Sequence, residues 1–281
     1  MNNKKETTDN FAHKLALLID ADNISGSLIG EIISEAGKYG KVTIRRAYGD
    51  FSSDHLKKWK EQINIYAIRP MQKFAYTTGK NSSDSALIID AMDIMHEKSV
   101  TGFCIVSSDS DFTGLALRIR EEGLFVLGIG KSSTPQAFQK ACEIFVFTEN
   151  LAVHKVNDEI NFENETEKVP SKKVVKVNLT KKQPVEEPKK IDIEQVVSKI
   201  DKNPIDLHLI ERAVKMALDD DELAYMGTIG EKLRTLDPSF DTRSYGFGSM
   251  TTMFKSMPGL YELVYRNNGS SLYIKPKFLS N

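Results

Sequence analysis

Short, almost continuously apolar segments, separated by amphipathic stretches, constrain the fold of this 281-residue chain more than any other feature. Between residues 11 and 150 the apolar segments are LALLID, KVTIRRAYG, INIYAI, GFCIVSS, LFVLGIG and EIFVF. Strands of this kind are buried on both faces, and the stretches between them have the length and pattern of helices. Right-handed crossovers make a doubly wound, mostly parallel α/β sheet the simplest topology for this domain.

The composition changes after residue 150. The stretch 151–190 mixes charges of both signs with Asn and Pro and holds one aromatic residue, Phe162. It lacks the apolar surface needed to offset the entropy of ordering, so we predict a flexible linker. From residue 191 a helical pattern returns in IDIEQVVSKI, IDLHLIERAVKMAL and MGTIGEKLRTL. A short fourth helix and a hairpin that turns at 268–269 would complete a smaller winged-helix domain over 191–281.

The charge balance and the cysteines limit the classes of function. The 38 basic and 39 acidic residues nearly cancel, so any nucleic-acid contact must come from a local patch. The two cysteines, Cys104 and Cys142, lie in apolar segments and are predicted to be reduced core residues of a cytoplasmic protein. No segment has the length and apolar character of a membrane span, so no membrane partner is expected.

Aspartates gather at the predicted carboxyl ends of the strands. Asp20 ends the first strand, Asp84 opens the helix in SDSALIIDAMDIM, and Asp109 and Asp111 follow the fourth strand. The carboxyl ends of parallel strands share one edge of a sheet, where ligands bind. Clustered carboxylates repel one another unless a cation lies among them, and oxygen ligands suit Mg²⁺ or Mn²⁺. We therefore predict these four aspartates as metal ligands, with Asn23 as a further oxygen donor in the catalytic set.

A purely structural interpretation competes with this one. Asp and Ser at strand-to-helix junctions are favoured N-caps, and Asp111 and either Ser82 or Ser83 fit that role. Asp90 and Asp93 lie on other faces of their helix than Asp84, and we expect them to be solvated or structural. The convergence of acids from three separate segments is what favours a metal site. Bound ions of this kind can activate water and assist phosphodiester cleavage.

The segment RPMQKFAYTTGKNSSD, before Asp84, combines cationic and aromatic residues. We interpret it as an exposed loop in which Arg69, Lys73 and Lys80 meet phosphates while Tyr76 stacks on a base, as in single-strand binding. The alternative is an ordinary solvated loop. The predicted acidic cluster nearby favours the RNA-binding interpretation.

Four motifs together are similar to a known family. LLIDADNIS, TGKNSSDSALIIDAMDIM, VSSDSDFTGLALRIREEG and GIGKSSTPQAFQKACEIFVF resemble the NYN domain in its LabA-like branch, a relative of the PIN nucleases, over residues 15–149. The resemblance implies a PIN-like, metal-dependent ribonuclease. In it, Asp20, Asn23, Asp84 and Asp109 would hold the family's acidic-site positions, and Asp111 would be a fourth carboxylate.

The C-terminal part also resembles a known module. MGTIGEKLRTLDPSFDTRSYGFGSMTTMFKSM and the strands that follow are similar to the OST-HTH domain, also called LOTUS, over residues 192–277. This resemblance implies RNA binding and, as in some members of that family, a helicase as protein partner. Within the module we predict Lys232 and Arg243 as exposed contacts to RNA phosphates.

The sequence leaves three functions in competition. The leading hypothesis is an endoribonuclease that uses metal-activated water, with the C-terminal module capturing the RNA substrate. A second is an RNA-binding adaptor without catalysis. A third is an aspartyl phosphatase with Asp20 as nucleophile and Asp22 as acid, although Ile24 stands where that pattern would have Thr or Val. The sequence is compatible with a homodimer as well as with a monomer.

Overall fold

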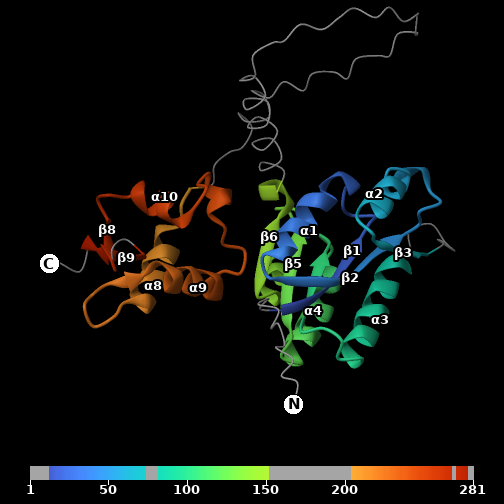
Figure 1. Cartoon of the computed structure of the whole chain (residues 1–281), viewed down its shortest axis with the longest axis horizontal. Helices are drawn as coiled ribbons and strands as arrows, with labels where there is room; N and C mark the ends of the chain where they lie inside the picture. Colours follow the sequence, from blue (N-terminus) through green and yellow to red (C-terminus); the bar gives the residue numbers. More distant parts are fainter. Residues whose placement is uncertain (1–12, 74–81, 152–203, 268–269, 278–281) are drawn as a thin grey trace, which may run out of the picture.

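Six parallel strands form the sheet of the first domain, which confirms the predicted doubly wound α/β architecture (Figure 1). The computed structural model describes residues 13–73, 82–151, 204–267 and 270–277. The strand order is β3-β2-β1-β4-β5-β6. The bounds are β1 (His13–Asp20), β2 (Gly40–Gly49), β3 (Arg69–Gln72), β4 (Gly102–Val106), β5 (Phe125–Gly130) and β6 (Ile144–Phe147).

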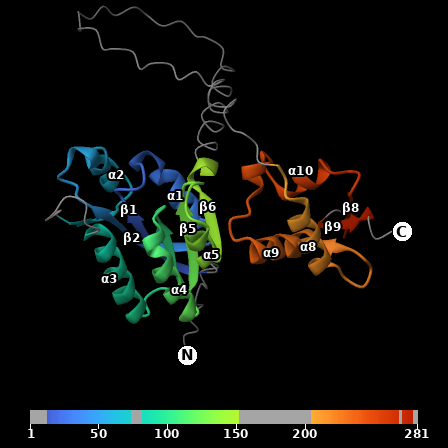
Figure 2. The same ribbon diagram turned by 180° about the vertical axis from the view of Figure 1, so that it is seen from behind.

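Helices cover both faces of this sheet, as the views from opposite sides show (Figures 1 and 2). Side chains of β1 alternate between the faces. Ala16 and Leu18 pack in a core with α3, α4 and α5, whereas Leu17 and Ile19 pack with α1 and α2. The bounds of the helices are α1 (Ile29–Gly37), α2 (Trp59–Ile65), α3 (Ser82–His96), α4 (Thr113–Glu121) and α5 (Gln136–Ala141).

The prediction of a strand in the apolar segment INIYAI is wrong. Its first half, residues 63–65, is the last turn of α2, and the chain then turns through Ala67 in a left-handed conformation. The third strand begins only at Arg69, in the segment predicted as a loop. β3 lies at the edge of the sheet, and among the strands of the described residues it pairs only with β2. Pro70 is tolerated there because an edge strand leaves one side of its backbone unpaired.

The strand order places a topological switch point between β1 and β4. From β1 the chain adds β2 and β3 on one side, and from β4 it adds β5 and β6 on the other. Crossovers that diverge in this way leave a crevice at the carboxyl ends of the two central strands. Ile19 pairs with Val106, so the next residues, Asp20 and Ser107, end neighbouring strands at this crevice.

The C-terminal module has its own small core and an antiparallel sheet in the order β7-β9-β8. Helices packed against a hairpin are the arrangement expected of a winged helix. The predicted helix at 191–200, the linker 151–190 and the turn at 268–269 lie wholly or almost wholly outside the described residues. The elements are α8 (Leu207–Ala217), β7 (Ala224–Tyr225), α9 (Met226–Leu236), the 3₁₀ turn η4 (Thr242–Tyr245), α10 (Met250–Lys255), β8 (Tyr261–Arg266) and β9 (Ser271–Pro276).

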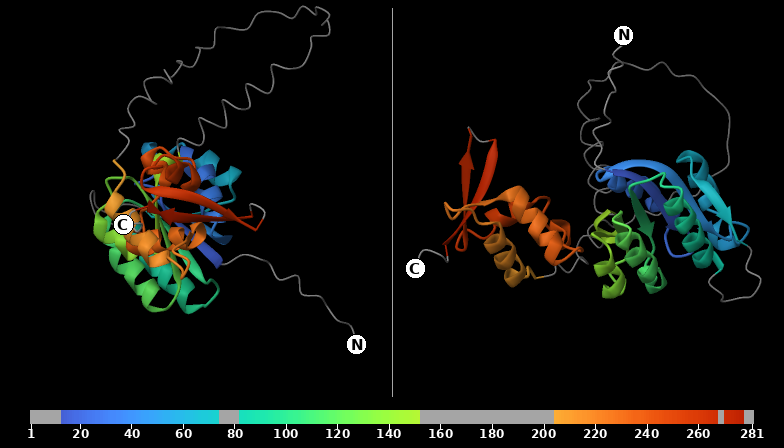
Figure 3. Two further views of the ribbon diagram at one scale, coloured as in Figure 1. Left: turned by 90° about the vertical axis from the view of Figure 1, so that its left-hand side faces the viewer. Right: turned by 90° about the horizontal axis from the view of Figure 1, so that it is seen from below.

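The module lies beside β6, at the end of the sheet far from β3 (Figures 1 and 3). Both cysteines are free thiols buried in the first domain, as predicted. Among the described residues, no helix combines the length and the apolar character required to cross a bilayer.

Candidate active site

Asp20 is a buried carboxylate at the carboxyl end of β1. Its Oδ2 atom accepts hydrogen bonds from Ser107 Oγ at 2.8 Å and from Asn23 Nδ2 at 2.6 Å. Its Oδ1 atom is buried and has no hydrogen-bond partner within the described part of the chain. Burial raises the pKa of Asp20, and the hydrogen bonds from Ser107 and Asn23 only partly offset that effect. A buried carboxylate with one free oxygen is suited to receive a cation.

Ser107 connects Asp20 to the turn after β4. Its hydroxyl donates to Asp20 and accepts from the backbone N–H of Asp109 at 3.1 Å. Asp109 in turn caps the 3₁₀ turn η3 (Ser110–Phe112), because its Oδ1 accepts from the N–H of Asp111 at 3.0 Å. Ser107 was not predicted as a site residue. Its place directly after β4, in register with Asp20 on β1, is the signal that could have identified it.

Asp84 lies in the first turn of α3 and is only 9% exposed. Burial and, after it, the negative charges of four other aspartates together raise its pKa from 3.8 to about 6. Those aspartates, in decreasing order of effect, are Asp20, Asp109, Asp111 and Asp22. The carboxylates at the ends of β1 and β4 therefore lie near enough to the start of α3 for their charges to act on Asp84.

The carboxylates do not form a complete set of metal ligands in this structure. In the described ranges, no three His, Cys, Asp or Glu side chains form a group that could hold a metal ion as they lie. The donor chemistry still fits a hard divalent cation, since the region offers carboxylate oxygens from Asp20, Asp84 and Asp109 and the unpartnered Oδ1 of Asp20. Binding would require the carboxylates to move toward a common ion.

Replacing Ser107 with alanine is expected to destabilise the domain by about 1–3 kcal/mol, because a buried carboxylate loses a hydrogen-bond donor. The free energy of unfolding in urea at neutral pH measures this effect. Ser110→Ala, at an exposed position of the same turn, is the matched control and should change stability little. Equal stability of the two variants would contradict a supporting role for Ser107.

Asp90 has a structural role, which agrees with the expectation from sequence. Its two carboxylate oxygens accept hydrogen bonds from Arg46 Nη1 and Tyr48 Oη, both on β2. Tyr48 is fully buried in the core beneath α3. These contacts fix α3 on the sheet and so fix the position of Asp84 at its N-terminal end.

The predicted RNA contacts fall into separate groups. Arg69 and Lys73 are exposed at the two ends of β3, and only Lys73 lies at the carboxyl edge with the aspartates. Tyr76 and Lys80 lie outside the described residues. Lys232 is half-buried on α9. The expectation that Arg243 is exposed is wrong, because its side chain is 17% exposed and bonded to Asp241 and Glu35.

Comparisons with known proteins agree with this architecture. The family model of the NYN domain matches residues 14–151, and the family model of the OST-HTH/LOTUS domain matches residues 186–273. The NYN domain is a PIN-like nuclease fold, and OST-HTH/LOTUS domains bind RNA. No curated protein matches the chain.

Two solved structures resemble parts of the chain. A protein of unknown function from Vibrio parahaemolyticus is 20% identical, with a TM-score of 0.40, over 47% of this chain and 91% of its own. An uncharacterized protein from Nitrosomonas europaea is 24% identical, with a TM-score of 0.25, over 35% of this chain and 92% of its own. Neither likeness bears on function. The two domain matches and the fold identify the chain as an NYN-domain protein with a C-terminal OST-HTH/LOTUS domain.

Proposed function

We propose that the protein is an endoribonuclease that depends on Mg²⁺ or Mn²⁺ and whose OST-HTH/LOTUS module binds the RNA substrate. The observation that carries the proposal is the buried Asp20 carboxylate at the end of β1, which is held through Oδ2 while its Oδ1 has no hydrogen-bond partner among the described residues. The pKa of Asp84, raised to about 6 by burial and by the charges of Asp20 and other aspartates, supports it. Carboxylates with perturbed pKa values are common at functional sites. Repulsion between them lowers the stability of the fold, and such a cost is typically found where function requires the groups. The NYN fold and the RNA-binding class of the second domain support the same function.

Asp20, Asp84 and Asp109 would hold the ion, with Asp111 as a further carboxylate at the exposed side. When bound, the cation supplies an activated water and neutralises charge on the phosphate. Ser107 and Asn23 hold the Asp20 carboxylate through its Oδ2 atom and leave Oδ1 free for the ion. Lys73, at the same edge of the sheet, would attract the RNA backbone.

The direct test incubates purified protein with labelled single-stranded RNA and DNA of one sequence, with Mg²⁺, with Mn²⁺ or with a chelator. We expect cleavage of RNA only when the cation is present. Asp109→Asn should lower the rate on the order of 10²–10³-fold, as loss of one charged group from a catalytic site does. RNA that is bound but never cleaved would contradict the proposal and favour the adaptor. Turnover of a small phosphomonoester, with RNA unchanged, would favour the phosphatase.

A further inference from the structure

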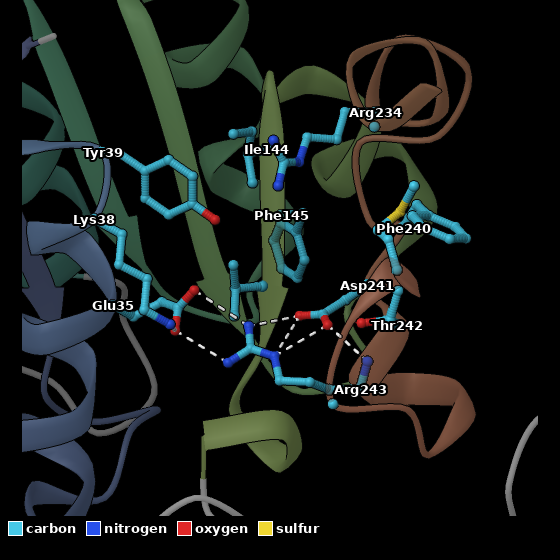
Figure 4. Close-up of a pocket in the computed structure, with 14 residues that line it drawn as sticks. Glu35, Lys38, Tyr39, Ile144, Phe145, Arg234, Phe240, Asp241, Thr242 and Arg243 are labelled. Carbon is cyan, nitrogen blue, oxygen red and sulfur yellow. Dashed lines mark hydrogen bonds and ion pairs between the residues drawn. The ribbon is translucent and has the colours of Figure 1, made fainter. Parts of the chain in front are cut away.

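Glu35, near the end of α1, is a carboxylate of the NYN domain that faces the C-terminal module (Figure 4). Its side chain is 4% exposed, and within its own domain it forms an ion pair with Lys38 at 2.7 Å. Arg243 of the module donates from Nη1 to Oε2 at 3.1 Å and from Nη2 to Oε1 at 3.2 Å. A bidentate ion pair between a guanidinium and a carboxylate is strong, and it forms only in a narrow range of orientations.

The Arg243 side chain is already oriented by its own module. Asp241 accepts hydrogen bonds from Nε at 2.9 Å and from Nη2 at 2.6 Å through Oδ2. The Oδ1 atom of Asp241 also accepts from the backbone N–H of Arg243 at 2.8 Å, which caps the turn η4. Because the guanidinium is held in place before it meets Glu35, contact with the NYN domain orders few additional groups.

Two further hydrogen bonds join the domains. The backbone N–H of Phe145, in the edge strand β6, donates to the carbonyl oxygen of Pro238 at 2.8 Å. Asn150, just after β6, donates from Nδ2 to Ser244 Oγ at 3.0 Å. An open edge strand presents unpaired N–H groups to solvent, and the Pro238 carbonyl satisfies one of them. All three contacts come from one short stretch of the module, residues 238–244.

Apolar side chains surround these polar contacts without filling the space between the domains. A cavity of about 380 Å³ remains, lined by Tyr39, Ile144, Phe240 and Met250 together with the charged groups. Specific polar contacts at fixed points, rather than a continuous apolar surface, therefore hold the domains together.

We propose that residues 238–244 are a docking element that fixes the C-terminal module on the β6 edge of the NYN domain, with Arg243 as its anchor. Arg243 then serves the contact between domains instead of RNA. Asn150 lies beyond the carboxyl end of β6, at the sheet edge that also carries Asp20. If the proposed function holds, RNA bound by the module would reach the aspartates from a fixed position.

The docking is tested on the full chain by electron spin resonance, which measures the distance between two spin labels and does not depend on catalysis. The labels are attached at Lys60→Cys and Lys255→Cys, both exposed positions in different domains. The native Cys104 and Cys142 are buried and should stay unlabelled. We expect one narrow distance peak in this labelled protein and in the control Arg212→Ala, an exposed arginine of α8 outside the docking element.

Arg243→Ala should lose the narrow peak and give a broad distribution, as expected of domains that no longer hold a fixed orientation. Circular dichroism checks that this variant is folded. If it is not, Glu35→Gln combined with Asn150→Ala removes two contacts from the NYN side and should broaden the peak in the same way. A broad distribution in the parent protein, or a peak that stays narrow when the anchor contacts are removed in a folded protein, would overturn the docking. Neither result would affect the ribonuclease proposal.

Discussion

Asp20→Asn is expected to lower the rate of RNA cleavage on the order of 10³-fold while the protein stays folded and binds RNA. An asparagine at this position keeps an oxygen that accepts from Ser107 and Asn23, so the local hydrogen bonds are retained. It replaces the charged, unpartnered Oδ1 with a neutral amide. The substitution therefore removes the negative charge that would attract a cation, together with the repulsion between Asp20 and Asp84.

Single-turnover cleavage at fixed Mn²⁺ measures the first part of this prediction, and fluorescence anisotropy with labelled RNA measures the second. Asp93→Asn, an exposed aspartate on α3, is the control and should cleave at the parent rate. Cleavage by Asp20→Asn at the parent rate, with a contaminating nuclease excluded, would show that this carboxylate does not take part in the chemistry.

Asp84→Asn is expected to stabilise the protein in the absence of divalent cations, by up to about 3 kcal/mol above neutral pH. The pKa of Asp84 is about 6 in the folded protein, against 3.8 for the unperturbed group. The folded state therefore favours the protonated form, and the parent protein loses stability as the pH rises from 3.8 to about 6. The loss is complete above that range, and the asparagine variant does not suffer it.

Urea unfolding with a chelator, at about pH 4 and at about pH 8, measures the effect. The parent protein and Asp84→Asn should be nearly equal in stability at about pH 4, and Asp84→Asn should be more stable at about pH 8. Added Mn²⁺ should narrow the difference, because a cation that binds the folded parent protein stabilises it. An equal difference at both pH values would contradict the raised pKa of Asp84. The control Asp93→Asn should show no such gain in stability.

The parts of the fold that the sequence predicted correctly are those with long apolar strands. β1 and β4 are central and buried on both faces, so their residues form unbroken apolar segments with clear carboxyl ends. Those ends fixed the expected positions of Asp20 and Asp109. The structure places both residues where the pattern predicts, although their roles as metal ligands stay predictions.

The third strand could not be predicted in the same way. INIYAI is apolar and six residues long, and a segment of that length suits a buried strand as well as the end of a helix. The actual strand, β3, begins with Arg69 and Pro70, because an edge strand needs neither two apolar faces nor a complete set of N–H donors. Local pattern alone does not distinguish these cases.

The position of Arg243 shows a second limit. Its partner Glu35 is 208 residues away along the chain, in the other domain. The polar residues around Arg243 in the segment DPSFDTRSYGF predict an exposed side chain. A contact between domains leaves no local periodicity, so only the three-dimensional arrangement assigns this side chain to the interface.

Calorimetric titration with Mn²⁺ tests the central claim most directly, since it asks whether the aspartates at the sheet edge bind an ion together. The parent protein should bind Mn²⁺, and Asp84→Asn and Asp109→Asn should each bind it much more weakly, although the two residues come from different segments of the chain. Asp93→Asn should bind as the parent does. If the parent protein binds no Mn²⁺, or if all four proteins bind it equally, the aspartates do not form a metal site and the proposed reaction fails.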